Sequence, residues 1–277
     1  MSRGGLIQST PACSTREAGE IQTSPDSVRF VQFTDPHLFA EADGALRGTV
    51  TAASLERVLD DIRRRDWHAD FYAVTGDLIQ DDTREAYERF RALAGGLDRP
   101  VYCLPGNHDV RPLMQEVLAG PPFHYCESRR QGAWLVVMID SCLDQTALGR
   151  VDEAELERLG TEIAATDARH VLVCLHHPPL PMRSRWLDEV GLDNAEVFLD
   201  LIASNAKVRG VLFGHVHQAF EAEYRGRRII GTPSTCRQFK PGADLFAVDD
   251  RPPAYRQVTL HADGRIAAEL IELSEDQ

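Results

Sequence analysis

The chain has 277 residues, of which 43% are hydrophobic and 7% aromatic, and its 30 basic and 43 acidic side chains give a formal net charge of −13. A protein that neutralises a phosphate backbone needs a cationic face, so this balance argues against a nucleic-acid partner and against binding to an anionic membrane surface. No apolar stretch approaches the roughly 18 residues of a membrane-spanning helix, so we expect no membrane partner.

Residues 1–27 are rich in Ser, Thr, Gly and Pro and lack the apolar core of a secretory signal. We therefore expect a disordered N-terminal tail, followed by one domain over residues 28–275. The six cysteines are scattered without a C-x-x-C pair, which is typical of reduced thiols and predicts a cytoplasmic protein.

Short runs of β-branched and aromatic residues predict buried strands. They lie at residues 28–34, 70–75, 101–104, 134–140, 170–176 and 208–214. Apolar residues at helical spacing predict helices between several of these strands. They lie around residues 55–62, 87–93, 156–163 and 197–202. This alternation favours an α/β fold with largely parallel strands. After Gly214, short strand-like pieces at 228–230, 246–248 and 257–260 predict a second, partly antiparallel sheet in the same domain.

Five of the predicted strands end in small groups of Asp, Asn or His. These groups are Asp35-Pro36-His37, Gly76-Asp77, Gly106-Asn107-His108-Asp109, His176-His177-Pro178 and Gly214-His215-Val216-His217. Because ligands of α/β sheets bind beyond the carboxyl ends of the strands, we expect the five groups to converge on one site.

The side chains of these groups predict a centre with two metal ions. Their oxygen and nitrogen donors suit Mn, Fe or Zn, and the absence of cysteine disfavours a soft-ligand site. The predicted ligands are Asp35, His37, Asp77, Asn107, His176, His215 and His217. A bridging carboxylate at Asp77 would raise the seven residues to eight donor positions, four for each ion. The glycines before Asp77, Asn107 and His215 permit tight turns. The alternative is a structural domain whose histidines are buried for packing.

In order and spacing, the five groups resemble those of the calcineurin-like metallophosphoesterases, over about residues 28–275. The segments 186–188, 192–195, 231–241 and 260–264 are similar to those of bacterial class III 3′,5′-cyclic-AMP phosphodiesterases of the CpdA type. The resemblance implies a four-layer αββα sandwich, in which two facing β-sheets are flanked by helices. It also implies a hydrolase that converts 3′,5′-cyclic AMP to 5′-AMP and lowers cellular cAMP signalling.

The resemblance further implies how the site is divided between two divalent ions, either iron with manganese or two manganese ions. The first ion would be held by Asp35, His37, Asp77 and His217. The second would be held by Asp77, Asn107, His176 and His215, with His177 left beside the site. A metal-bridging hydroxide would attack phosphorus in line with the leaving oxygen.

By the same resemblance, His108 is the catalytic residue, which would contact a phosphoryl oxygen or protonate the departing 3′-oxygen. Asp109 could orient its imidazole. Substrate contacts are implied for His37, Asp77, Asn107, His108 and His217.

Several expectations stay open at the level of sequence. Arg237 and Lys240 are either surface charges or cations at the mouth of the site, and Phe39 and Phe239 either stack an adenine or lie in the core. Glycerophosphodiesters and 2′,3′-cyclic nucleotides are alternative substrates, and a metal-containing nucleotide sensor is the non-enzymatic alternative. Both a monomer and a dimer are compatible with the sequence.

Overall fold

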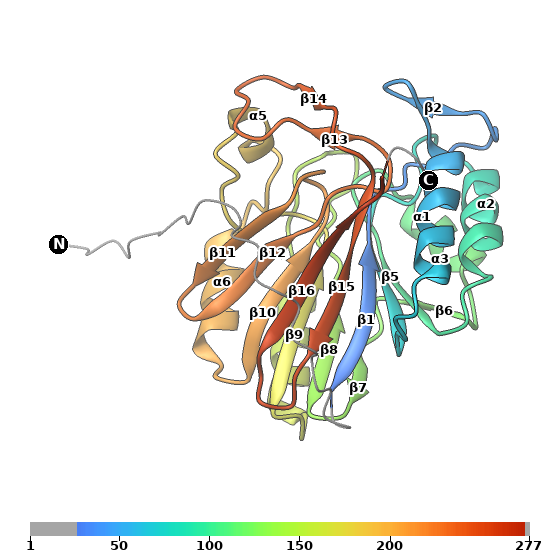
Figure 1. The fold of residues 1–277 in the computed structure, drawn as a ribbon. Coiled ribbons are helices and arrows are strands. Elements are labelled where there is room, and N and C mark those ends of the chain that lie inside the picture. The colour runs from blue at the N-terminus through green and yellow to red at the C-terminus, as the bar shows by residue number, and fades with distance from the viewer. Residues whose placement is uncertain (1–26, 275–277) are drawn as a thin grey trace.

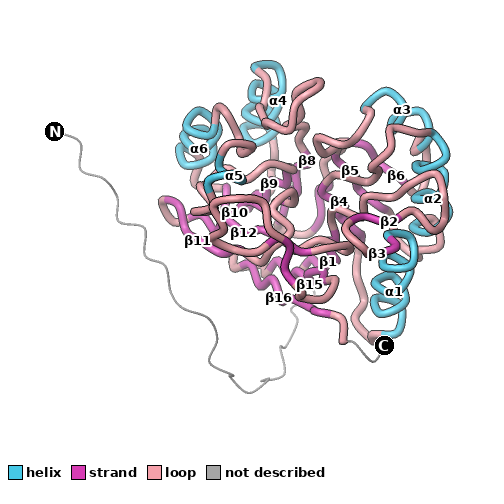
Figure 2. Tube along the Cα trace, turned by 90° about the horizontal axis from the view of Figure 1, so that it is seen from above, coloured by secondary structure: helices cyan, strands magenta, loops and turns pink. Residues whose placement is uncertain are grey.

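The computed structural model describes residues 27–274, in which two six-stranded sheets lie face to face with helices outside each (Figures 1 and 2). The first sheet has the strand order β16-β15-β1-β4-β5-β6. Its strands are β1 (Val28–Phe33), β4 (Phe71–Thr75), β5 (Val101–Leu104), β6 (Phe123–Tyr125), β15 (Ala254–Leu260) and β16 (Ile266–Glu272). Strands β1, β4, β5 and β6 are parallel to one another. Strand β15 pairs antiparallel with β1, and β16 pairs antiparallel with β15.

The second sheet has the strand order β11-β12-β10-β9-β8-β7. Its strands are β7 (Arg129–Gln131), β8 (Trp134–Met138), β9 (His170–Leu175), β10 (Val208–Phe213), β11 (Phe220–Tyr224) and β12 (Arg227–Gly231). The four inner strands are parallel, and the edge strands β7 and β11 are antiparallel.

Helices cover the outer face of each sheet. On the first sheet these are α1 (Thr51–Arg64), α2 (Arg84–Ala94) and α3 (Arg111–Val117), and on the second α4 (Glu153–Ala165) and α6 (Ala195–Ser204) (Figure 2). The short helix α5 (Arg185–Asp188) lies at the end of the molecule where two small hairpins are found (Figure 1). The hairpins are β2 (Ala45–Leu46) with β3 (Thr49–Val50), and β13 (Gln238–Phe239) with β14 (Val248–Asp249).

Successive strand residues pack into different layers. On β1, Phe30 lies in the core between the sheets, whereas Val31 packs into the core beneath α1 and α2. On β9, Leu172 lies between the sheets and Val173 faces the helices of the second sheet. Both faces of the central strands are therefore buried, which explains why they read as nearly continuous apolar runs.

The structure confirms the predicted α/β class and the four layers. The six predicted strands appear as β1, β4, β5, β8, β9 and β10, and the four predicted helices as α1, α2, α4 and α6. The interpretation of the pieces after Gly214 as a second sheet was wrong. The second sheet already begins at β7, and the later strands divide between the sheets: β12 joins β10, β15 joins β1, and β14 forms a hairpin with β13.

Two other expectations concern the ends of the chain and the membrane. The predicted disordered tail lies, except for Ser27, outside the described residues. Over residues 27–274, none of the helices has the length and apolar character that crossing a membrane requires.

Candidate metal centre

The five polar groups meet at one end of the molecule, beyond the carboxyl ends of β1, β4, β5, β9 and β10. Because these strands run in the same direction within each sheet, the loops that follow them lie at one edge. The first sheet contributes Asp35, His37, Asp77, Asn107 and His108, and the second contributes His176, His215 and His217. The site therefore spans both sheets.

One group of ligand atoms is formed by Asp35, His37 and His217, which are all buried. The Nε2 atoms of His37 and His217 are 3.0 Å apart. Nε2 of His217 lies 3.3 Å from Oδ1 of Asp35, and Nε2 of His37 lies 3.7 Å from Oδ2 of Asp77.

A second group surrounds the ring of His176. Its Nε2 lies 3.3 Å from Oδ2 of Asp77, 3.2 Å from Oδ1 of Asn107 and 3.2 Å from Nδ1 of His215. Oδ2 of Asp77 thus faces both groups, so this carboxylate could contribute a ligand atom to each of two ions.

Backbone carbonyls fix the tautomers of two of these histidines. Nδ1 of His176 lies 2.8 Å from the carbonyl oxygen of Thr75, and Nδ1 of His217 lies 2.6 Å from that of Arg237. Since a carbonyl only accepts, Nδ1 carries the hydrogen in each neutral ring, and the lone pair on Nε2 faces other acceptors. Lone pairs and carboxylates that converge in a buried site need positive charge between them. The donor set therefore fits two divalent cations.

The electrostatics of the pocket favour ionised carboxylates and, at most positions, neutral imidazoles. Burial opposes ionisation of Asp77, but His176, His108 and His37 more than offset it and hold its pKa well below the usual value. Burial also opposes ionisation of Asp35, but His217 and His176 together outweigh it and lower the pKa of this carboxyl. Burial lowers the pKa of both His37 and His215 to about 3. Ionised carboxylates and neutral imidazoles are the forms that bind metal ions.

His176 shows how strongly the site attracts positive charge. Burial lowers the pKa of this imidazole, but the carboxylates of Asp77 and Asp35, with the carbonyl of Thr75, outweigh burial and raise the pKa to about 9. In the absence of metal a proton would occupy the position between these two side chains, and a cation would replace it.

The backbone at the site is in an unusual conformation. Five of the seven predicted ligands have a positive φ, between 46° and 66°. Residues other than glycine rarely adopt this backbone conformation. The five ligands are Asp35, His37, Asp77, His215 and His217. Such strain persists where the surrounding structure imposes it, and it is concentrated at functional sites. Here the N–H groups of Asp35 and His37 donate to the carbonyls of Gly76 and Asp77, each at 3.0 Å.

Two glycines leave room for the carboxylates. A Cβ at Gly106 would lie 2.2 Å from Oδ1 of Asp77, and one at Gly214 would lie 2.8 Å from Oδ2 of Asp35. Both oxygens of Asp35 also accept the N–H of His215 at 3.1 Å, which ties the loop after β1 to the loop after β10. Close approach of backbone to side chain explains why glycine stands at both positions.

His108 lies at the edge of the metal centre and lines a cavity of about 260 Å³. Its Nδ1 is 3.2 Å from Nε2 of Gln80, and its backbone N–H donates to Oδ1 of Asp77 at 2.9 Å. Sequence reasoning missed Gln80. The available signal was its position three residues after Asp77, in the same loop.

The suggestion that Asp109 orients the imidazole of His108 was wrong. The carboxylate of Asp109 accepts the N–H of Gly106 at 2.8 Å, the N–H of Leu78 at 3.1 Å and the hydroxyl of Tyr87 at 2.8 Å. It therefore holds together the two loops that carry Asp77 and Asn107.

His177 lies behind His176 and His215, with ligand atoms of the three rings within 4.8 Å of one another. Its Nδ1 is 2.9 Å from Oγ of Ser141, and the ring packs against the backbone of Gly149, where a Cβ would lie 2.2 Å from its Cγ. Ser141 and Gly149 thus fix the ring of His177 beside the centre.

Two of the four side chains whose place in the site the sequence did not determine line the cavity. Phe239 and Arg237 line it, whereas Phe39 and the exposed Lys240 do not. The guanidinium of Arg237 pairs with Asp250 at 2.8 Å.

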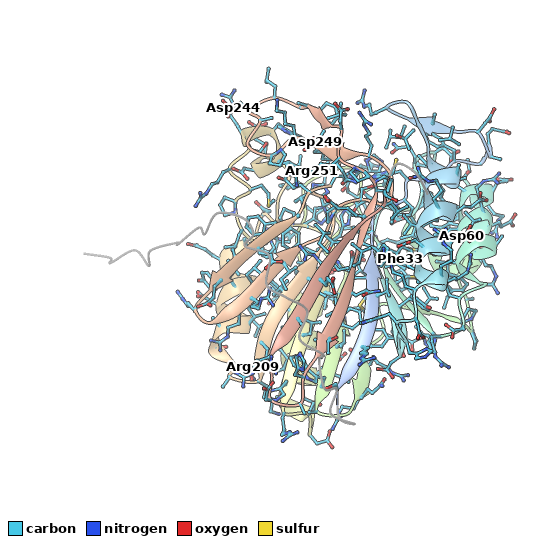
Figure 3. All side chains as sticks on the ribbon, viewed as in Figure 1. Phe33, Asp60, Arg209, Asp244, Asp249 and Arg251 are labelled. Atoms are coloured by element: carbon cyan, nitrogen blue, oxygen red, sulfur yellow. The ribbon has the colours of Figure 1, made fainter. Side chains whose placement is uncertain are left out.

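The remaining lining is made of aromatic and cationic side chains. Trp186 and Phe246 join Phe239, and Arg47 from the turn between β2 and β3 faces the ring of Phe246. Asp249 lies on β14, which pairs with the strand β13 that carries Phe239. Figure 3 shows Asp249 at this end of the molecule and Arg209 at the opposite end.

Comparisons with known proteins agree with this geometry. Residues 28–219 match the family of calcineurin-like phosphoesterases. The chain is 38% identical to the 3′,5′-cyclic adenosine monophosphate phosphodiesterase CpdA of Pseudomonas aeruginosa over 240 residues, which cover 87% of this chain and 88% of the relative. It is 37% identical to CpdA of Escherichia coli K12 over 249 residues, which cover 90% of each chain.

A solved structure of a dimetal phosphatase from Danio rerio superimposes with a TM-score of 0.63 at 17% identity, covering 89% of this chain and 99% of that one. At this identity, the likeness shows a shared fold.

Proposed function

The chain belongs to the calcineurin-like phosphoesterase family, and from this premise we propose that it is a metal-dependent phosphodiesterase that hydrolyses 3′,5′-cyclic AMP to 5′-AMP. The observation that carries the proposal is the pair of histidine–carboxylate groups that share Asp77 and border a cavity lined by His108. The cyclic AMP phosphodiesterases among its relatives support the choice of substrate.

Asp35, His37, Asp77 and His217 would hold one ion, and Asp77, Asn107, His176 and His215 the other. Their oxygen and nitrogen donors suit iron with manganese, or two manganese ions. When bound, two such ions supply an activated water for in-line attack on phosphorus and neutralise the charge of the phosphoryl oxygens.

The chain's own side chains orient the phosphate and handle the proton. His108 lines the cavity next to Asn107 and Asp77, where its imidazole can contact a phosphoryl oxygen or protonate the 3′-oxygen as the phosphorus–oxygen bond breaks. An alkoxide is a poor leaving group, so proton transfer to it speeds the reaction. Arg47 and Arg237 line the same cavity and attract the anionic diester.

The decisive experiment measures conversion of cyclic AMP to AMP by the full chain, before and after chelation and with manganese or iron restored. We expect chelation to abolish turnover and one of these metals to restore it. Failure of every metal to support hydrolysis would contradict the proposal. Turnover of only glycerophosphodiesters or 2′,3′-cyclic nucleotides would replace the substrate, and bound metal without hydrolysis of any diester would indicate a nucleotide sensor.

A further inference from the structure

An aromatic wall, formed by Trp186, Phe239 and Phe246, lies beside the metal centre, and we propose that it binds the purine base of the substrate. The inference rests on the proposed function and adds the part of the nucleotide that the metal ligands do not contact. The sequence had raised Phe239 as a candidate for stacking, and the structure joins it to two side chains from separate segments.

The wall begins at a proposed metal ligand. The ring of Phe239 is parallel to that of His217, with 4.0 Å between centroids and 5° between planes. Trp186 on α5 and Phe246 before β14 meet Phe239 edge to face, at 5.1 Å and 5.3 Å. A ligand whose phosphate lies at the metal centre would therefore have aromatic surface within reach.

The wall offers both apolar surface and unused donors. Phe246 is 42% exposed and lines the cavity, so part of its ring is open to a ligand there. The indole N–H of Trp186 and the Nε–H of Arg237 are buried, and neither has a hydrogen-bond partner among the described residues. A purine could satisfy both, because its faces stack on aromatic rings and its ring nitrogens accept hydrogen bonds from N–H groups.

Charge argues against the other ligand that aromatic walls commonly bind, a quaternary ammonium group such as that of a choline ester. The guanidinium of Arg47 already lies 4.8 Å from the ring centroid of Phe246, and Arg237 lines the same cavity. Among the described lining residues Asp77 is the only carboxylate, and it belongs to the metal centre. These two arginines would repel a quaternary ammonium group, whereas they would not repel an uncharged base.

The test compares two ligands that differ only by the base, 5′-AMP and ribose 5-phosphate. Their affinities for the manganese-loaded full chain are measured by isothermal titration calorimetry, with phosphocholine as a third ligand. We expect AMP to bind at least about tenfold more tightly than ribose 5-phosphate, as is typical for the stacking of one base. Phe246→Ala and Trp186→Ala should each reduce this advantage to about threefold or less.

Leu245→Ala is the matched control. Leu245 precedes Phe246 in the same loop and is 74% exposed, but it does not line the cavity. This variant should keep the full advantage of AMP.

Equal binding of AMP and ribose 5-phosphate to the wild type would overturn the inference, as would an advantage that survives in both variants of the wall. Tighter binding of phosphocholine than of AMP would overturn it in favour of a choline site. Hydrolysis of cyclic AMP together with equal binding would leave the proposed function intact and remove the base site. A base advantage that depends on Phe246, without hydrolysis of cyclic AMP, would remove the function and keep the base site.

Discussion

The side-chain amide of Gln80 lies 3.2 Å from Nδ1 of His108. A side chain that holds one ring nitrogen fixes both the orientation and the tautomer of the imidazole. Gln80 therefore acts as a positioning residue for His108.

Replacing Gln80 tests this role. We expect Gln80→Ala to lower kcat about tenfold with a smaller change in KM, the scale on which partners of site residues usually act. In Gln80→Glu the new negative charge favours the imidazolium form of His108, so the alkaline limb of the kcat–pH profile should move to higher pH. A profile that does not move in Gln80→Glu would reduce Gln80 to a packing role.

The contribution of His108 to proton transfer can be measured by changing the leaving group. His108→Ala should slow hydrolysis of cyclic AMP by about a hundredfold or more. The loss should be much smaller for a nitrophenyl diester, whose leaving group needs no proton. Equal losses for the two substrates would assign His108 to binding of the phosphoryl oxygens instead.

Oδ2 of Asp77 lies within 3.7 Å of Nε2 of both His37 and His176, whereas the ring nitrogen nearest to Oδ1 of Asp35 is Nε2 of His217, at 3.3 Å. Metal analysis should therefore find more than one ion per chain lost in Asp77→Asn and about one lost in Asp35→Asn. Activity should fall at least about a hundredfold in both.

Asp82→Asn is the control for both substitutions, because Asp82 is exposed in the same loop and asparagine tolerates its φ of 56°. It should retain both ions. If Asp77→Asn also retained both ions, Asp77 would not bridge them.

The bonds to Asp109 predict a cost in stability. Asp109→Ala leaves the N–H groups of Leu78 and Gly106 without their acceptor and should lower the free energy of unfolding by about 3 kcal/mol. Tyr87→Phe removes one hydroxyl from the same carboxylate and leaves the N–H of Val110 without its acceptor, and it should cost about 2 kcal/mol. Urea denaturation measures both values. An unchanged free energy of unfolding in Asp109→Ala would contradict this structural role.

His170 predicts a pH dependence of stability at the end of the molecule opposite the site, where Figure 3 shows Arg209. Burial, together with Arg209, whose Nε donates to Nδ1 of His170 at 3.2 Å, holds the pKa of His170 below its usual 6.5. The unfolded chain therefore binds this proton more tightly, and the stability contributed by neutral His170 is lost as pH falls below about 6.5.

His170→Gln should accordingly weaken the decrease in unfolding free energy between pH 7.5 and pH 5.5. The exposed His68 provides the control, and His68→Gln should leave the slope unchanged. An unchanged slope in His170→Gln would show that this histidine is not a source of the acid sensitivity.

The sequence predicted those parts of the fold that are determined within one segment. The continuous apolar run before Asp77 indicates a strand that is buried on both faces, and the helical spacing around Leu55 indicates a helix that is buried on one face. Both elements could therefore be located. Strands of two or three residues, such as β2, β3 and β6, carry too few positions for a period. The pairing of β15 with β1 could not be predicted, because the partners are more than 200 residues apart and neither strand specifies the other.

The same limit applies to the site. The proposed ligands were recognisable because each group directly follows a strand and the strand direction brings them together. The partner of Asp109 and the joining of Trp186 to Phe246 depend on side-chain directions and on loop geometry. Neighbouring residues in the sequence do not determine these, and His108 and Asp109, adjacent in the chain, face different partners.

The division of the proposed ligands between the two sheets has a consequence for folding. Each ion would take ligands from both sheets, so neither sheet alone can form either coordination sphere. Ions bound in this way cross-link the two halves of the sandwich, and a chain with only one sheet formed would have no complete metal site. High-affinity metal uptake would therefore report that the two sheets have docked.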